Sequence, residues 1–230
     1  MNKIFVSGIC ANKPEDWKSL LAKSEHWKNG HSAKALASCW QETEKNDFPE
    51  SVRRAFNKSG IGLFQNIELL LALPEYKVVL PGGEHPSQND IFVLATGDNR
   101  LISITVEGKV SETFGPTVGE WLKENYGGKK ERLDFLLNKL GLKNDKINHI
   151  RYQLLHRTAS AVIEAERFGA KNALMLIHSF SPADHPKGFP DYSEFLDLFH
   201  LKAEQDSLVG PKNISGIDLY FGWANGEIKN

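Results

Sequence analysis

The segment Asp90–Val110 restricts the possible folds of this chain more than any other stretch, because it predicts a β-hairpin. Two runs rich in Val, Ile and Phe flank the turn-forming tetrad Gly97–Arg100. Such runs, joined by a short polar turn, are typical of paired antiparallel strands. Asp98 and Asn99 tolerate the positive φ angles of a tight hairpin turn. With these two as the central turn residues, the register of the strands follows.

In that register one face of the hairpin is apolar and the other carries charge at its open end. Ile91 faces Val106 on the apolar side, whereas Asp90 faces Glu107 on the other side, with Lys109 pointing the same way. Facing Cβ atoms lie roughly 4.5–5.5 Å apart, so the two carboxylates repel each other. A divalent cation, which prefers hard oxygen ligands, is the simplest reason to place them together. A longer turn that shifted the register by an odd number of residues would put the two acids on opposite faces.

An acid at the start of one strand, followed by Glu-x-Lys near the end of the next, resembles the core motif of the PD-(D/E)XK nuclease superfamily. In this chain the motif reads Asn89-Asp90 and then Glu107-Gly108-Lys109, so that Asn89 stands where the family's name has proline. The chain as a whole also resembles uncharacterised bacterial domains. The acid-x-Lys spacing recurs at Asp16–Lys18, Glu75–Lys77 and Glu227–Lys229, none of which follows a hairpin with a facing acid.

The resemblance implies an α/β fold with a restriction-endonuclease-like core, in which helices flank a mixed β-sheet. It covers about residues 61–180. We expect a single domain over residues 1–230, with a helical N-terminal extension in 1–50 and a C-terminal helix and strand in 181–230. The predicted order of strand, strand, long helix and strand agrees with that architecture.

The resemblance also implies a catalytic site that depends on a metal. Asp90 and Glu107 would hold Mg²⁺ or Mn²⁺, with the backbone carbonyl of Gly108 as a further ligand. The metal would lower the pKa of a bound water and polarise the phosphate. Lys109 would position that water and offset the negative charge that develops in the transition state.

A predicted helix that ends near Leu73 supplies one more candidate ligand. Its apolar stripe consists of Leu63, Ile67, Leu70 and Leu71, and Glu68 lies off that stripe. In the superfamily an acid on the helix before the first core strand sometimes adds a metal ligand, so Glu68 is a candidate for this role. The alternative is an ordinary glutamate on the solvated face of a helix.

The predicted helix from about Ile147 to Phe168 carries a polar stripe that includes Gln153 and Arg157. Some superfamily members have Gln followed four residues later by Tyr on this helix, whereas here Arg157 follows Gln153. Gln153 would orient water and Arg157 would meet an oxyanion; the alternative is a solvated face. His149 and His156 are seven residues apart, which differs from the spacing of a helical metal pair and favours surface or partly packed histidines.

Three further segments complete the prediction. The apolar run Asn172–Phe180 predicts a strand covered on both faces, with His178 either reaching the site or hydrogen-bonded in the core. Gly216–Ala224 predicts a late strand, placed at a sheet edge. The loop Pro81–Ser87 leads directly to Asp90, so we expect it to border the site, where its two glycines would let the backbone approach a ligand and Glu84 and His85 are weaker candidates.

Composition narrows the class of protein. The chain has 230 residues, of which 40% are hydrophobic, with two cysteines and a formal net charge of −1. No apolar run predicts a membrane span or a signal peptide, and two cysteines make no disulfide framework, so we expect a cytoplasmic protein without a membrane partner. Residues 129–157 hold eight basic and three acidic residues, whereas 181–230 hold four basic and eight acidic ones. This asymmetry suits one phosphate-facing side, or merely solvated helix faces.

Three hypotheses follow for the function. The first is a metal-dependent nuclease that hydrolyses phosphodiester bonds of nucleic acid, with DNA favoured over RNA. The second is a non-catalytic binding or partner protein on the same fold, because a fold does not imply an activity. The third is an unrelated α/β protein in which Asp90, Glu107 and Lys109 form only a surface salt-bridge cluster. The sequence predicts neither the substrate within these classes nor the oligomeric state.

Overall fold

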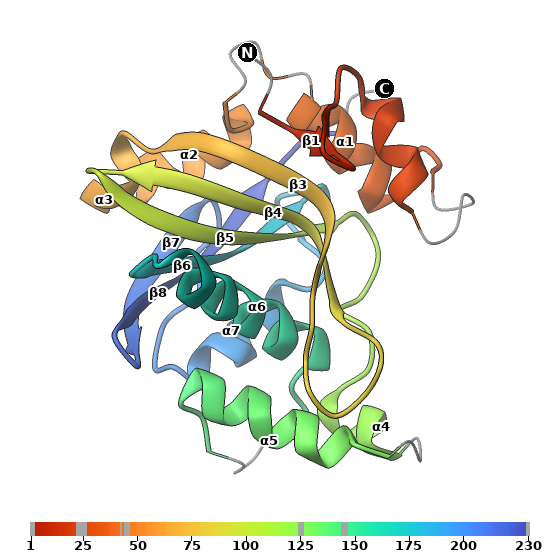
Figure 1. The fold of residues 1–230 in the computed structure, drawn as a ribbon, viewed down its shortest axis with the longest axis vertical. Helices are drawn as coiled ribbons and strands as arrows, with labels where there is room; N and C mark the ends of the chain where they lie inside the picture. Colours follow the sequence, from red (N-terminus) through yellow and green to blue (C-terminus); the bar gives the residue numbers. More distant parts are fainter. Residues whose placement is uncertain are drawn as a thin grey trace.

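The computed structural model describes residues 3–21, 27–41, 43, 47–123, 127–143 and 147–228. Its centre is a six-stranded mixed sheet with helices on both faces (Figure 1). The predicted class, an α/β fold with a mixed sheet flanked by helices, is therefore confirmed. The strands are β1 Phe5–Val6, β2 Ile9–Cys10, β3 Glu68–Val78, β4 Ser87–Gly97, β5 Arg100–Lys109, β6 Asn172–Ser179, β7 Ser207–Ile214 and β8 Ile217–Asn225. The helices are η1 Pro14–Leu20, α1 Ser32–Gln41, α2 Glu50–Ser59, α3 Gly62–Gln65, α4 Val118–Lys123, α5 Lys129–Leu140, α6 Tyr152–Phe168 and α7 Phe189–Asp197.

The strand order in the main sheet is β3-β4-β5-β6-β8-β7. The first three strands form an antiparallel meander, and β6 then lies parallel to β5. A parallel neighbour requires a long crossover connection, which α4, α5 and α6 provide. The strand β8 lies parallel to β6, and β7 closes the sheet as an antiparallel edge strand.

The predicted hairpin register is confirmed. Asp98 and Asn99 adopt φ angles of 48° and 58°, as a tight turn with two left-handed central residues requires. Ile91 pairs with Val106, and the pairing continues without a shift to the turn. The next residue beyond this pair on each strand is an acid, Asp90 on β4 and Glu107 on β5.

Each face of the sheet buries its own apolar core. On one face α1, α2 and α3 pack on the sheet, and on the other α5, α6 and α7 do so (Figure 1). Trp40 of α1 is fully buried in the first core. Within residues 1–50, the described segments therefore pack on the sheet rather than extend away from it.

The helix predicted to end near Leu73 is wrong beyond its first turn. Only Gly62–Gln65 is helical, and Glu68–Val78 forms the edge strand β3. Leu, Ala and Glu favour helices intrinsically, but pairing with β4 overrides this weak local preference. Pro74 is tolerated in β3 because an edge strand leaves one side of its backbone unpaired. Part of that outer side is covered, since Ala72 N–H donates to the Lys3 carbonyl at 2.8 Å.

The start of the long helix and the position of the last strand in the sheet also differ from the prediction. The long helix begins at Tyr152 rather than near Ile147, so His149 precedes it and does not share a face with His156. The strand Ile217–Asn225 lies inside the sheet between β6 and β7, not at an edge. The edge strand β7 was not predicted, because Pro211 interrupts its pattern. Its register with β8 is irregular at that point.

Candidate active site

Three polar side chains form a closed ring of hydrogen bonds between β5 and α6. Glu107 Oε1 accepts from Lys109 Nζ at 2.8 Å and from Gln153 Nε2 at 2.7 Å. Lys109 Nζ also donates to Gln153 Oε1 at 3.0 Å. The ammonium lies 5.1 Å from the centroid of the Phe114 ring, which shields it from solvent. The sequence motif Glu-x-Lys and the predicted Gln153 therefore meet at one point.

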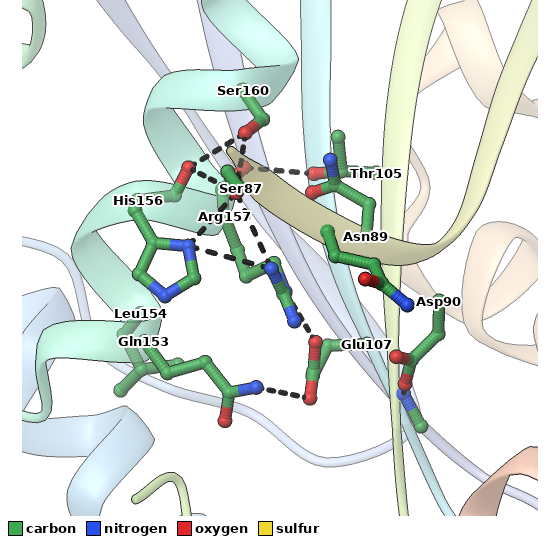
Figure 2. Close-up of polar contacts among 12 residues, drawn as sticks. Ser87, Asn89, Asp90, Thr105, Glu107, Gln153, Leu154, His156, Arg157 and Ser160 are labelled. Carbon is green, nitrogen blue, oxygen red and sulfur yellow. Dashed lines mark hydrogen bonds and ion pairs between the residues drawn. The ribbon is translucent and has the colours of Figure 1, made fainter. Parts of the chain in front are cut away.

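Arg157 completes this group from the next turn of α6. Its Nε donates to Glu107 Oε2 at 2.5 Å (Figure 2). Burial by itself would raise the pKa of Glu107, but the neighbouring Arg157 and Lys109 outweigh that effect and hold it below its usual value. We call Glu107, Lys109, Gln153 and Arg157 the charged cluster.

The charged cluster is not a surface feature. Glu107, Lys109 and Arg157 are 3%, 6% and 7% exposed. The part of the third hypothesis that placed these residues in a salt-bridge cluster on the surface is therefore wrong for Glu107 and Lys109. A buried ion pair must recover a large desolvation cost through good geometry and additional hydrogen bonds, and the ring through Gln153 supplies such bonds.

Hydroxyl groups of β5 fix α6 against the sheet and so position Gln153 and Arg157. Ser103 Oγ donates to the Ala161 carbonyl at 2.8 Å, and Thr105 Oγ1 donates to the Arg157 carbonyl at 3.1 Å. The polar stripe of α6 consequently faces the sheet. Its alternative interpretation as a solvated face is wrong for Arg157, which is buried, and for Glu164, which has no exposed surface.

Asp90 lies beside the charged cluster with a different environment. Its Oδ2 accepts from the Gly108 N–H at 2.7 Å. The N–H and C=O of one strand residue point to the same side, so the Gly108 carbonyl lies on the side of β4 too. Burial raises the pKa of Asp90 well above its usual value, and the charge of Glu107 raises it further. This carboxyl lacks the strong cationic partner that Glu107 has in Arg157.

The edge strand β3 brings a third acid, Glu75, to the same place. Pro74 pairs with Ile91 and Tyr76 pairs with Asn89, so Glu75 between them lies opposite Asp90. Glu75 adopts a left-handed conformation with φ of 53°, and its carboxylate accepts from the Gln88 side-chain amide. Burial raises the pKa of Glu75, and Glu107 adds to this effect. Three acids from three adjacent strands thus occupy one row.

Glu68, the acid proposed as a third metal ligand, lies elsewhere. It pairs with Thr96 at the other end of β4 and is exposed. Six strand residues separate Thr96 from Asp90, which corresponds to roughly 20 Å. Glu68 is therefore not part of this site, because the segment that holds it is a strand and not a helix beside the site. The third acid of the site, Glu75, is marked in the sequence only by the acid-x-Lys spacing at Glu75–Lys77.

The chemistry of these residues fits a divalent cation, although the oxygens of Glu107 already accept hydrogen bonds from the protein. Asp90 and Glu107 offer hard oxygen donors, and the buried Asn89 Oδ1 has no hydrogen-bond partner among the described residues. Within that same part of the chain, however, no three His, Cys, Asp or Glu side chains are arranged to hold a metal. Both oxygens of Glu107 already accept from protein donors. Oε1 accepts two hydrogen bonds and Oε2 only one, so a metal bound to Glu107 would use Oε2 and lie next to the Arg157 guanidinium.

A second buried polar group lies on the opposite face of the sheet. His178 Nδ1 accepts from Trp40 Nε1 at 3.1 Å, and its Nε2 lies 2.9 Å from Ser51 Oγ. Burial lowers the pKa of His178 to about 3, so the ring is neutral. We call Trp40, Ser51 and His178 the neutral cluster. Of the two roles considered for His178, that of a hydrogen-bonded core histidine is confirmed.

Gly108 separates the two clusters. It pairs with His178 across β5 and β6. A Cβ atom on Gly108 would lie 2.3 Å from Leu36 Cδ1 and 3.4 Å from Asp90 Oδ2. The first contact is far too short, so this position needs a glycine while α1 packs against the sheet in this way.

The loop before β4 borders the site as predicted, but Gly82 allows close packing within the protein rather than close approach to a ligand. Ser87 Oγ accepts from Arg157 Nη1 at 3.3 Å and lies 2.8 Å from His156 Nδ1. Gly82 allows the backbone to approach α5, since a Cβ there would lie 2.3 Å from the Gly128 carbonyl oxygen. Sequence reasoning missed the pair of Ser87 and His156, because nothing local in the chain brings residues so distant together.

Comparison with known proteins gives the family but no activity. A family model described as Domain of unknown function (DUF6946) matches residues 10–228. No curated protein and no solved structure matches the chain. Among the described residues, no helix has both the length and the apolar character needed to cross a membrane. Since the family model covers nearly the whole sequence, the chain belongs to the DUF6946 family.

Proposed function

We propose that this protein is a metal-dependent nuclease with a restriction-endonuclease-like core, as the sequence resemblance implies. The order of elements supports this proposal: the antiparallel meander β3-β4-β5 is followed by a helical crossover that ends in α6, and then by β6 parallel to β5. The position of the motif supports it too. Asp90 lies on the second strand of the meander, Glu107 and Lys109 on the third, and Gln153 on α6, the last helix before β6.

The observation that carries the proposal is the ring formed by Glu107, Lys109 and Gln153. These residues come from two elements far apart in the chain, and each bonds to both of the others. The Gln153 amide is one of the additional partners that a buried ion pair needs to recover its desolvation cost. The added amide gives the lysine a fixed direction, which a group that must meet a reacting atom requires.

In this proposal Asp90 and Glu107 would hold Mg²⁺ or Mn²⁺, with the Gly108 carbonyl as a further ligand. Such a metal would lower the pKa of a bound water and polarise the phosphodiester. Lys109 donates to a phosphate oxygen and offsets the charge that develops there. Gln153 orients the attacking water through its amide, and Arg157 moves from Glu107 to a phosphate oxygen, which suits its planar donor geometry.

The test is cleavage of plasmid DNA and of a single-stranded RNA in the presence of Mg²⁺ or Mn²⁺. We expect cleavage by the wild type and a loss of about 100-fold or more in Lys109→Met, because that change removes the charge stabilisation of the transition state. The matched control is Lys130→Met, which alters an exposed lysine paired with Asp134 on α5. Equal cleavage rates for Lys109→Met and the wild type would refute the assignment of the site.

Binding without catalysis is a second candidate, favoured by one observation. Glu107 accepts from Lys109, Gln153 and Arg157, so two cations already neutralise the carboxylate that would hold the metal. Calorimetric titration of Mg²⁺ into the wild type and into Asp90→Ala distinguishes the two candidates. Metal binding that Asp90→Ala abolishes supports the nuclease. Nucleic-acid binding that persists in EDTA, with no cleavage in any metal, supports the binding protein.

A further inference from the structure

A cavity of about 620 Å³ opens next to the charged cluster. It lies between the loop before β4, the helices α4 and α5, and the first turn of α6. Its volume is in the range of small-ligand sites. The side chains that matter below are Ser87, Trp121, Lys129, Arg132, Tyr152 and His156, all of which line it.

The protein itself holds the wall of this cavity in place. The Arg132 guanidinium, which is buried, donates to the carbonyls of Pro81 at 2.9 Å, Gly83 at 2.9 Å and His85 at 2.7 Å. The loop therefore wraps around a fixed cation and needs no ligand to take its shape. A preformed cavity avoids the entropic cost of ordering a loop on binding.

His156 presents a hydrogen-bond donor to this cavity. Its Nδ1 faces Arg157 Nη1 at 3.4 Å and Ser87 Oγ at 2.8 Å (Figure 2). A guanidinium can only donate, so Nδ1 is the unprotonated nitrogen. Burial lowers the pKa of His156 well below its usual value, and the charges of Arg157, Arg132 and Lys109 lower it further. The single ring proton of the neutral histidine is therefore on Nε2.

No described residue accepts a hydrogen bond from His156 Nε2, and the surroundings favour an anion as its partner. Arg132 and Lys129 line the cavity, and Arg157 lies directly behind Ser87. Among the described residues of the lining, the only acid is Glu84, an exposed loop residue. A neutral donor surrounded by fixed cations is a site for an anionic oxygen.

Aromatic rings form the other part of the wall. Trp121 and Tyr152 are stacked with their centroids 3.9 Å apart and their planes 8° apart. Tyr152 is followed by His156, whose ring centroid lies 4.8 Å from its own. Lys129 Nζ lies 5.0 Å from the Trp121 ring centroid. Aromatic side chains next to cations are typical of surfaces that take a base together with its phosphate.

We propose that this cavity binds one nucleotide unit of the nucleic-acid substrate, with a phosphate oxygen accepting from His156 Nε2 and the base against Trp121 and Tyr152. The proposal rests on the proposed nuclease function and extends it. Ser87 and Arg157 connect the cavity to Glu107 through hydrogen bonds. A nucleotide bound here would therefore lie beside the residues that act on the backbone of the same strand.

The test measures binding of thymidine 5′-monophosphate in EDTA, so that it requires neither metal nor cleavage. We expect the ¹⁵N resonances of the His156 ring to show a proton on Nε2 and to shift on titration. We expect His156→Gln to weaken binding about tenfold, as for the loss of a hydrogen bond to a charged group. The matched control is His149→Gln, an exposed histidine outside the cavity, which should bind as the wild type does.

A second variant distinguishes binding of the base from binding of the phosphate. It also keeps the test informative if His156→Gln does not fold. Trp121→Leu should weaken binding of the nucleotide but leave binding of inorganic phosphate unchanged. The proposal is overturned if the wild type does not bind the nucleotide, or if His156→Gln and Trp121→Leu both bind it as the wild type does. Either result would leave Lys109-dependent cleavage intact. Nucleotide binding without cleavage in any metal would instead refute the nuclease and keep the cavity as a nucleotide site.

Discussion

The charged cluster and the neutral cluster lie back to back on opposite faces of the sheet, and their buried polar groups have different kinds of hydrogen-bond partner. The neutral cluster joins one ring of β6 to one partner on α1 and one on α2, and none of its members is charged. The charged cluster gathers one carboxylate and two cations, next to two further acids whose pKa values are raised. Gly108 lies between the two clusters and pairs with His178.

This difference separates a group that serves folding from a group suited to chemistry. Hydrogen bonds between neutral partners satisfy a buried histidine at little electrostatic cost. Buried charges cost more, and replacing them with apolar residues is often neutral or stabilising. A chain that retains the buried charges of Glu107, Lys109 and Arg157, beside the half-buried Asp90 and Glu75, therefore accepts a stability penalty that the neutral cluster avoids. Perturbed carboxyl groups of this kind are typical of functional sites.

The largest effect on stability is expected for Glu107→Gln. The substitution leaves Lys109 and Arg157 buried with no anion between them, which costs about 3–5 kcal/mol in the free energy of unfolding. Urea denaturation measures this loss. The matched control is Glu194→Gln on α7, an exposed glutamate, for which we expect a change within about 0.5 kcal/mol. Equal stability of the two variants would show that the charged cluster is not formed in solution.

Removal of the neutral ring should have a smaller effect. His178→Leu leaves the Trp40 Nε1–H and the Ser51 hydroxyl without a partner, and we expect a loss of about 2–3 kcal/mol at neutral pH. Plasmid cleavage, if present, should be retained by the folded protein, because His178 faces away from the charged cluster. A variant that keeps its stability but loses cleavage would place His178 in the site after all.

The pH dependence of this second effect has a defined sign. The pKa of His178 is about 3 in the folded protein and about 6.5 in the unfolded chain. Its contribution to stability is therefore complete above pH 6.5 and declines by about 1.4 kcal/mol per pH unit as the pH falls from there toward 3. His178→Leu lacks this term, while His156 is common to both proteins. The stability deficit of the variant should thus shrink from about pH 6.5 downward, as urea denaturation at several pH values will show; a constant deficit contradicts it.

The smallest change concerns the residue between the clusters. Gly108→Ala forces Leu36 to move, because the new Cβ would lie 2.3 Å from its Cδ1. The end of a leucine side chain is flexible, so we expect a loss of about 1 kcal/mol. In a Leu36→Ala background, which has its own cost of about 2–5 kcal/mol, Gly108→Ala should add little further loss. Gly62→Ala is the control, since a Cβ there meets nothing within 4 Å. That helical substitution should be neutral or stabilising by up to about 1 kcal/mol, and a larger loss there than at Gly108 would contradict the packing described.

The parts of the fold that were predicted correctly depend on local information. The hairpin register follows from two turn residues and an alternating pattern, and the end of α6 follows from Gly169 in its left-handed cap. Asp90, Glu107 and Lys109 could be placed in one site because the hairpin register fixes them, whereas Gln153 was added through the resemblance to the superfamily. The metal itself stays a prediction.

The parts that were missed depend on contacts between distant segments. The strand β3 reads as a helix because its leucines satisfy helical spacing, and only pairing with β4 decides otherwise. The role of Glu75 then follows from that pairing, and so does the exclusion of Glu68. The polar stripe of α6 also had two interpretations from the sequence alone. The hydroxyls of Ser103 and Thr105, which select the buried one, lie about 50 residues away from their partners.

Both edges of the main sheet are unsuited to extension by another chain. On β3 the Lys3 carbonyl already accepts from Ala72, Pro74 lacks an N–H, and Glu75 breaks the extended conformation. On β7 Pro211 removes a donor where the register with β8 is irregular. An intruding strand would find a continuous ladder on neither side. Pro74 and the left-handed Glu75, which the register of β3 places opposite Asp90, thus also protect the protein against edge-to-edge aggregation.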